Sequence, residues 1–168
     1  MLVNIIEQQH HFLSELFAKH QESLIQLRLD LAQQYLEQFS NFLHAHMQLE
    51  EAYIFSAFAE IKHQSRWDVS LYIQEHQKIK KILEDIKTDL NWLIEQNFSG
   101  SDLNRNIIAF IDKQKTLKGL NSHHEDREET AMLVDLEQQL DETKLRILVS
   151  DIKLTWAEVM AAIQHNEH

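Results

Sequence analysis

Two stretches of the sequence each place a histidine one helical turn before a pair of glutamates. HMQLEEAYIF holds His46 and Glu50, and HHEDREETAML holds His124 and Glu128, 78 residues further on. Residues four apart lie on one face of a helix, so each His and Glu would project together. Their segments are rich in apolar residues, and a buried carboxylate is costly unless it is paired or binds a metal. Imidazole and carboxylate ligands without thiolate suit iron, manganese or zinc.

A further histidine lies at the height of His124 if the helices that carry them are antiparallel. His76 lies 21 residues before Asn97, and His124 lies 22 residues after Asp102. Between them, NFSGSD is the clearest loop signal in the chain. The matched lengths predict that these two histidines meet across the bundle.

The same reasoning selects a histidine on the first helix. The midpoint between His10 and His46 is residue 28, close to a helix start near Asp30, which is a good N-cap. For His20 the midpoint is residue 33, inside an uninterrupted helical run, and His20 would lie about 15 Å from His10 along the axis. His10 is therefore preferred, with His11 and His20 as alternatives. The predicted ligands of a dinuclear site are His10, His46, Glu50, His76, His124 and Glu128.

Long helices must position these side chains. The chain has no proline and only two glycines, and its apolar residues recur at three- and four-residue steps. This pattern predicts an all-α fold. The expected helices cover about residues 3–24, 30–61, 69–90 and 103–140, and a fifth begins near 142. Short connections between helices of this length favour an up-down-up-down four-helix bundle.

Two units are expected along the chain. Residues 1–140 form the four-helix bundle, and 141–168 form a C-terminal helix with a clean apolar stripe that includes Trp156. This helix is expected to cover the side of the bundle or to form a homodimer interface. Gly119 is expected to bend the fourth helix, since a helical glycine costs roughly 1 kcal/mol.

Composition narrows the classes of partner. A net charge of -11 argues against a nucleic-acid partner, because no basic stripe is present to neutralise phosphates. The absence of cysteine excludes a disulfide framework, a thiolate metal site and a thiol nucleophile. No apolar run reaches the length of a membrane span, and the N-terminal residues lack a basic segment and cleavage site. A cytoplasmic protein with no membrane partner is therefore expected.

The two H-x-x-x-E-E elements, followed by AYIF and TAML, resemble those of the hemerythrin-like family of HHE cation-binding four-helix bundles. The resemblance covers roughly residues 5 to 140, and QEHQKI, which ends at Ile79, is similar to the family's third-helix Glu-His element. It implies a non-haem di-iron centre, with two Fe ions favoured over Mn or Zn. By this resemblance His10 and His46 would hold one iron, and His76 and His124 the other. Glu50 and Glu128 would bridge the two irons.

The sequence also departs from the family pattern. Ser56 stands where a proline often follows the first motif, and the second motif lacks Phe-Pro. Oxygen-carrying members place two histidines one turn apart on the third helix, but the neighbours of His76 at this spacing are Tyr72 and Lys80. One iron would then have a spare position or a ligand such as Tyr72. This favours redox chemistry with oxygen, peroxide or nitric oxide over reversible oxygen storage.

The leading interpretation is a hemerythrin-like protein that senses or handles oxygen, peroxide, nitric oxide or iron at a His/Glu-bridged site. Its partner would be a small diatomic ligand or peroxide. The alternatives are a metal-free helical protein-interaction module and an enzyme with peroxidase- or reductase-like turnover. Glu51 and Glu129 are expected to be solvated or to support the ligands, and Glu129 is the alternative bridge in a shifted register.

Overall fold

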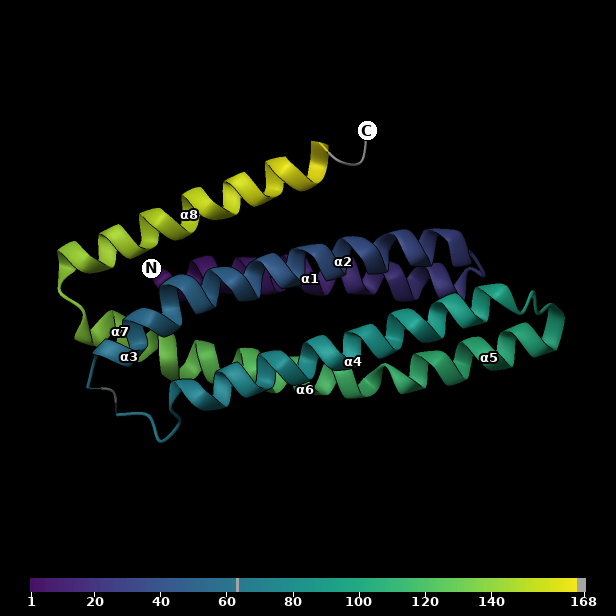
Figure 1. Ribbon diagram of the computed structural model, residues 1–168, viewed down its shortest axis with the longest axis horizontal. Coiled ribbons are helices and arrows are strands. Elements are labelled where there is room, and N and C mark those ends of the chain that lie inside the picture. The colour runs from purple at the N-terminus through teal and green to yellow at the C-terminus, as the bar shows by residue number, and fades with distance from the viewer. Residues whose placement is uncertain (63, 166–168) are drawn as a thin grey trace.

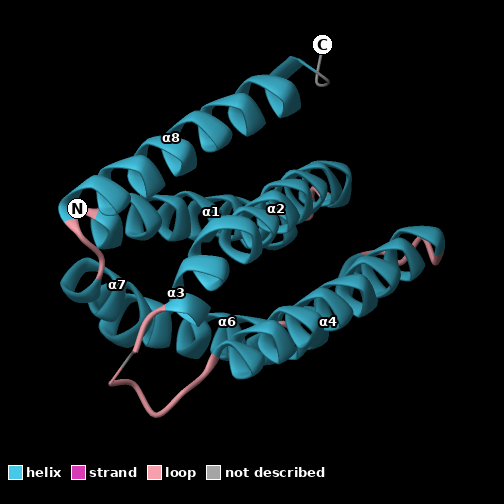
Figure 2. Ribbon diagram, turned by 60° about the vertical axis from the view of Figure 1, so that its left-hand side comes forward, coloured by secondary structure: helices cyan, strands magenta, loops and turns pink. Residues whose placement is uncertain are grey.

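The computed structural model describes residues 1–62 and 64–165, and within these ranges it contains helices and loops without a strand (Figures 1 and 2). Four antiparallel rods form the bundle, and a fifth helix lies beside it. The rods are α1 (Leu2–Ile25); α2 (Leu29–Leu49), η1 (Glu50–Phe55) and α3 (Ser56–Glu60); α4 (Val69–Glu95); and α5 (Gly100–Lys113), α6 (Lys115–Arg127), η2 (Glu128–Met132) and α7 (Leu133–Gln139). The fifth helix is α8 (Glu142–His165). The predicted up-down-up-down bundle with an additional helix is confirmed.

Short connections keep neighbouring rods antiparallel. Leu27, with φ 60°, turns the chain between α1 and α2, where the amide of Arg28 donates to the carbonyl of Ser23 at 2.9 Å. Asn97 and Gly100 take the left-handed conformation in the NFSGSD loop, with φ values of 52° and 57°. Glycine adopts this conformation without the steric cost of a Cβ atom.

The fourth rod is interrupted at Gln114, and the expected bend at Gly119 is wrong. Gly119 lies inside α6, whereas α5 and α6 meet at Gln114, whose side chain is fully buried. Its amide group donates from Nε2 to His20 Nε2 at 2.9 Å, and its Oε1 accepts from Gln21 at 2.9 Å. The position of the break therefore coincides with a buried polar contact between the first and fourth rods.

A layer of buried polar side chains separates two apolar clusters along the bundle. One cluster surrounds Leu43, Leu83 and Phe110 toward the NFSGSD end, and the other surrounds Ile6 and Phe58 at the opposite end. The buried members of the polar layer are Gln9, His10, His46, Glu50, Glu75, His76, His124 and Glu128.

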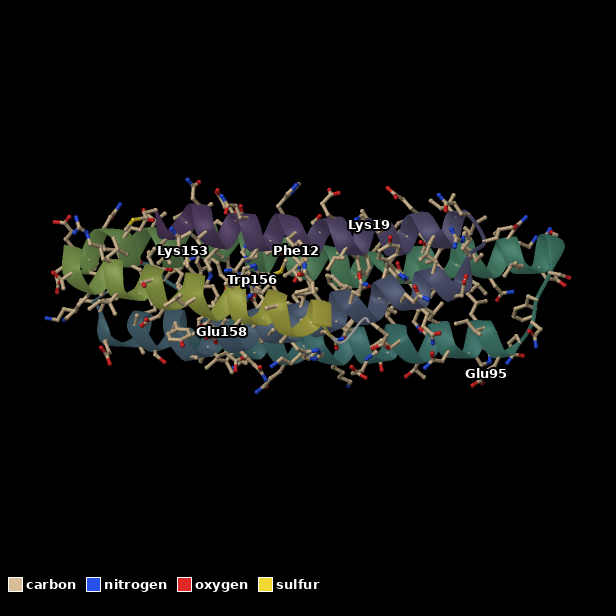
Figure 3. All side chains as sticks on the ribbon, turned by 90° about the horizontal axis from the view of Figure 1, so that it is seen from above. Phe12, Lys19, Glu95, Lys153, Trp156 and Glu158 are labelled. Carbon is tan, nitrogen blue, oxygen red and sulfur yellow. The ribbon has the colours of Figure 1, made fainter. Side chains whose placement is uncertain are left out.

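Helix α8 lies along α1 and α2 (Figures 1 and 3). Its apolar stripe begins in the cluster around Phe58, and Trp156 packs against both clusters. Figure 3 shows Trp156 directed toward Phe12, while Lys153 and Glu158 are exposed. Residues 166–168 of the expected C-terminal segment lie outside the described residues. Among the described residues, no helix is long and apolar enough to cross a membrane.

Candidate metal centre

All six side chains that the sequence singles out converge in the polar layer. They form two groups of buried donors, and within each group the donor atoms lie within 4.8 Å of one another. The four histidines come from four different rods, and the two glutamates belong to both groups. The groups are His10, His46, Glu50 and Glu128, and Glu50, His76, His124 and Glu128.

The two shared glutamates each begin a short π-helical segment. Glu50 is the first residue of η1, and Glu128 is the first residue of η2. Such wide turns are rare and occur frequently at functional sites. Besides other buried residues such as Phe55 and Leu133, each rod has a line of buried side chains that repeats at four-residue steps through the wide turn. These positions are His46, Glu50, Ile54 and Phe58 in one rod, and His124, Glu128, Met132 and Leu136 in the other.

A regular α-helix does not keep such a repeat on one face. With 3.6 residues per turn, a four-residue repeat drifts around the helix by about 40° at each step. The π-helical turn absorbs this drift, so the ligand and the apolar side chains after it both point inward. In α4, which has no wide turn, the corresponding line of buried side chains alternates between four- and three-residue steps, with Glu75 buried beside it: Tyr72, His76, Ile79, Leu83, Ile86, Leu90 and Leu93. The strict spacing is the sequence signal for the π segments, and sequence reasoning missed it.

Each histidine presents its Nε2 atom to the interior. His46 Nε2 lies 2.9 Å from Glu50 Oε1, and His76 Nε2 lies 3.2 Å from Glu50 Oε2. His124 Nε2 lies 3.1 Å from Glu128 Oε1, and His10 Nε2 lies 3.4 Å from Glu128 Oε2. The Nε2 atoms of His76 and His124 are 3.0 Å apart. Four nitrogens therefore surround two carboxylates inside one small volume.

Each histidine is held from outside through its Nδ1 atom. Nδ1–H of every ring donates to a side-chain oxygen, and this fixes the ring orientation and leaves the Nε2 lone pair facing inward. The pairs are His10 with Glu129 at 2.6 Å, His46 with Gln9 at 2.8 Å, His76 with Glu51 at 2.8 Å and His124 with Glu75 at 2.8 Å.

Two of these outer partners were expected to be near the site, and two were not. Glu51 accepts from His76 and Glu129 accepts from His10, each across to another rod. Glu129, the alternative bridge, is not a member of either donor group. Gln9 and Glu75 were not selected as site residues by sequence reasoning. Each directly precedes a predicted ligand in the sequence, and Glu75 is also the glutamate of the Glu-His element in QEHQKI. The other oxygen of Glu75 accepts from Arg127.

The arrangement fits a pair of cations. Among the described residues, five buried atoms of this centre have no hydrogen-bonding partner: His10 Nε2 and both carboxylate oxygens of Glu50 and of Glu128. Leaving such atoms unsatisfied costs about 1–3 kcal/mol each, and more for charged groups. Cations bound between them would satisfy all five, and nitrogen and oxygen donors suit iron, manganese or zinc.

Electrostatics in this layer favour charged side chains despite their burial. Burial by itself lowers the pKa of His10, but contacts with Glu128, Glu129 and Glu50 outweigh it and raise that pKa well above its usual value. Burial raises the pKa of Glu50, yet its histidine neighbours, His46 foremost, hold it well below the ordinary range. These opposite pKa shifts of His10 and Glu50 favour the charged forms of both groups in the metal-free layer.

The alternative ligands lie elsewhere. His20 is fully buried, but its Nδ1–H donates to the carbonyl of Ala32 at 2.8 Å, and its other nitrogen accepts from Gln114. His11 is exposed. The hydroxyl of Tyr72 donates to the carbonyl of Arg127 at 3.3 Å, although its ring packs against His124. Its hydroxyl is thus engaged by the backbone in this structure.

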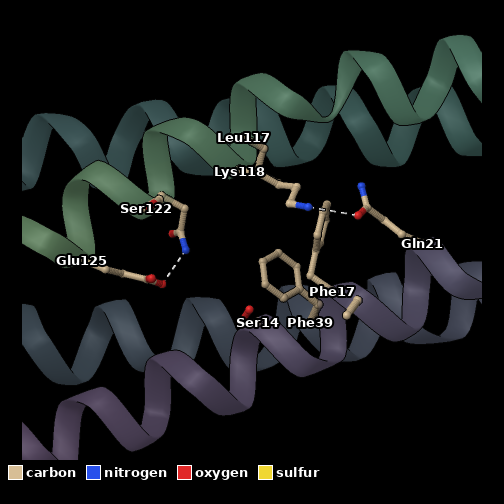
Figure 4. Close-up of a pocket in the computed structure, with 10 residues that line it drawn as sticks. Ser14, Phe17, Gln21, Phe39, Leu117, Lys118, Ser122 and Glu125 are labelled. Carbon is tan, nitrogen blue, oxygen red and sulfur yellow. Dashed lines mark hydrogen bonds between the residues drawn. The ribbon is translucent and has the colours of Figure 1, made fainter.

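A pocket of about 320 Å³ opens between α1 and α6 beside the centre (Figure 4). Its lining is mixed: Phe17, Phe39 and Leu117 are apolar, and Lys118 and Glu125 are among its polar residues. Burial raises the pKa of Glu125 to about 7, against the lowering effect of nearby His10 and of a hydrogen bond from Asn121. The pocket therefore reaches a carboxyl group that lies within electrostatic range of His10.

Comparison with known proteins supports the same conclusion from the sequence side. Residues 1–136 match the family model described as the hemerythrin HHE cation-binding domain. No curated protein and no solved structure gave a significant match. The matched region contains all six predicted ligands and ends before α8 begins.

Proposed function

This chain belongs to the hemerythrin HHE cation-binding family, and we propose that it binds two iron ions at the centre formed by the two donor groups. Family membership implies cation binding, and the observation that carries the finer proposal is that Glu50 and Glu128 are common to both groups. Two carboxylates that each face two sets of histidines are placed to bridge a pair of ions. His10 and His46 would hold one ion, and His76 and His124 the other.

The residues of the centre have separate roles in this proposal. The histidines supply neutral nitrogen donors, and the two carboxylates offset ionic charge and set the separation of the ions. Side-chain oxygens at the four Nδ1 atoms keep the rings in the required tautomer. When bound, a pair of iron ions supplies redox chemistry with dioxygen, peroxide or nitric oxide. Manganese and zinc are less favoured alternatives.

We further propose that a small diatomic molecule or peroxide reaches the centre through the pocket between α1 and α6. Phe17, Phe39 and Leu117 give the mixed lining of this pocket an apolar patch that suits a small uncharged molecule, and Glu125 in its wall lies next to His124 in the chain. Among the described residues, each donor group offers four side chains to its ion, which leaves further coordination positions for such a molecule. The same centre could serve a sensor or an enzyme. An enzyme would consume peroxide, whereas a sensor would bind its ligand without consuming it.

Metal analysis tests the proposal. Protein purified from iron-supplied cells should carry close to two irons per chain, and His46→Ala combined with His124→Ala should reduce this number to near zero. A near-zero count in the wild-type protein, with fold and stability unchanged in the double variant, would favour a metal-free interaction module. Peroxide turnover well above that of free iron would identify an enzyme, and ligand binding without turnover would identify a sensor.

A further inference from the structure

The four histidines of the centre differ in the group that supports them. Three of them donate Nδ1–H to a carboxylate, whereas His46 donates to the neutral amide oxygen of Gln9. The position between His76 and His124 therefore has two carboxylate-supported rings, and the position between His10 and His46 has one. The inner carboxylates do not remove this difference, because both groups share them.

A carboxylate at Nδ1 makes the opposite nitrogen a stronger metal ligand. It stabilises positive charge on the ring, and exchange of such partners typically changes metal affinity by about 10–100-fold. An amide oxygen carries no net charge, so it raises ligand basicity less. The two positions of the centre should therefore differ in affinity even though their inner donors are alike.

The outer partners of His46 and His124 also differ in how they are held. Glu75, which supports His124, is only 9 % exposed and is held through its other oxygen by Arg127, so its orientation is fixed. Gln9 is 2 % exposed, and its Nε2 atom has no hydrogen-bonding partner among the described residues. The ring of His46 also packs against Trp156 of α8, with ring centroids 6.2 Å apart.

We propose that the two metal positions are unequal: the His76/His124 position fills first and binds more tightly, and Gln9 makes the His10/His46 position the exchangeable one. This rests on the proposed dinuclear centre. The protein would then pass through a one-ion state over a range of metal concentration, and occupancy of the second position would report the availability of the metal.

The order of filling is the decisive measurement. Metal-free full-length protein is titrated with Co(II), and the exchangeable, metal-shifted imidazole Nδ1–H signals are followed by NMR; an anaerobic Fe(II) titration then checks the same order. At one equivalent of Co(II), the metal-shifted signals of His76 and His124 should be present and those of His10 and His46 should be absent or weak. The latter should appear as the second equivalent is added. Repulsion between two ions would separate the two binding constants even at equal positions, so the spacing of the constants alone decides nothing.

Exchange of the outer partners tests the cause. Gln9→Glu should raise the weaker affinity about 10-fold, and Glu75→Gln should lower the stronger one by about 10–100-fold. Gln8→Glu adds the same charge at an exposed neighbour of Gln9, and Asp85→Asn removes a charge from an exposed position of α4. These two controls should leave both affinities near the wild-type values.

Different results would overturn the dinuclear centre and the inequality of its two positions. If neither Co(II) nor Fe(II) binds, the dinuclear centre itself is excluded. If two ions bind but the His10/His46 position fills first, or both fill together, the inequality alone is overturned. It is also overturned if Gln9→Glu changes affinity no more than Gln8→Glu. Circular dichroism verifies the fold of each variant, and the filling order in the wild type decides the question even if a variant does not fold.

Discussion

His46 and Trp156 meet edge to face, with their ring planes at 81° and their centroids 6.2 Å apart. The tryptophan belongs to α8, outside the region that the family model matches. It also contacts Phe12 and Phe42, so its position is fixed by a small aromatic cluster. The helix after the bundle therefore carries a fluorophore that lies beside one predicted ligand.

Iron binding should quench the fluorescence of Trp156. The ring of His46 lies 6.2 Å from the indole ring, centroid to centroid, so an iron ion bound at its Nε2 would lie close enough for efficient quenching. Trp156→Phe should abolish most of the iron-dependent change while keeping an aromatic ring in the cluster. Steady-state emission during iron titration measures it.

Trp92→Phe is the matched control. Trp92 is half-exposed and lies 16 residues after His76 on α4, or about 24 Å along the axis. Its replacement should leave the quenching intact. Equal loss of quenching in both variants would contradict the placement of an ion at His46.

Removal of a shared carboxylate should affect both ions, whereas removal of one histidine should affect one. Glu50→Gln is expected to lower retained iron from about two ions toward zero, because Glu50 belongs to both donor groups. His46→Ala should lower it to about one. Iron content after dialysis measures both, and Glu60→Gln, an exposed change on α3, is the control. Retention of one ion in Glu50→Gln would mean that the carboxylate serves one position.

Deletion of Ala52 tests the role of the first π segment. Ala52 is exposed inside η1, and loss of one residue should close the wide turn into an α-helix. Closed into an α-helix, the segment from His46 to Phe58 returns to the same face within about 20°, so Ile54 and Phe58 should stay in the core and the free energy of unfolding should change little. Denaturant unfolding measures this change, and Ala52→Ser should also stay close to wild type. A large loss of stability in the deletion variant would show that the wide turn is more than an accommodated extra residue.

The contribution of His20 to stability should depend on pH. Burial lowers the pKa of His20 below its usual 6.5, despite the opposing hydrogen bond to Ala32. The unfolded chain then binds the proton more readily, so the stabilisation is fully present above pH 6.5 and is lost as the pH falls through the lower folded value. His20→Leu should cost about 1–3 kcal/mol at pH 7.5, because it removes the acceptor of the buried Gln114 Nε2.

The difference between wild type and His20→Leu should narrow when unfolding is measured at pH 5.5. Both proteins share the same metal centre, so the titration of its groups contributes equally to the two stabilities and cancels in their difference at each pH. His11→Leu, at an exposed position of the same helix, should show no such pH-dependent difference. A difference that widens on acidification would reverse the sign assigned to His20.

The inner donors of the centre could be predicted from sequence because they depend on quantities that a sequence contains. Spacing of four residues placed His46 with Glu50, and equal distances to a loop placed His76 opposite His124. The structure brings these side chains together with His10 and Glu128. Their assignment as metal ligands stays a prediction until an ion is measured.

The outer contacts could not be predicted in the same way. Whether Gln9 or Glu75 reaches an Nδ1 atom depends on the rotation of each rod about its own axis, and residue spacing does not fix this rotation. The break at Gln114 was missed for a similar reason, since it accompanies a side-chain contact with His20 across the bundle. Gly119 was selected on helix propensity alone, and packing overrode that weak preference.

The polar layer that separates the two apolar clusters has a consequence for cooperativity. Each cluster draws on several rods, and α1, α4 and Trp156 connect the two ends across the tier, where Glu50 and Glu128 repel each other in the metal-free protein. Ions at this tier would tie the ends into one unfolding unit. Amide hydrogens near Ile6 and near Leu90 should then exchange through separate openings in the metal-free protein and through a single shared opening in the loaded one.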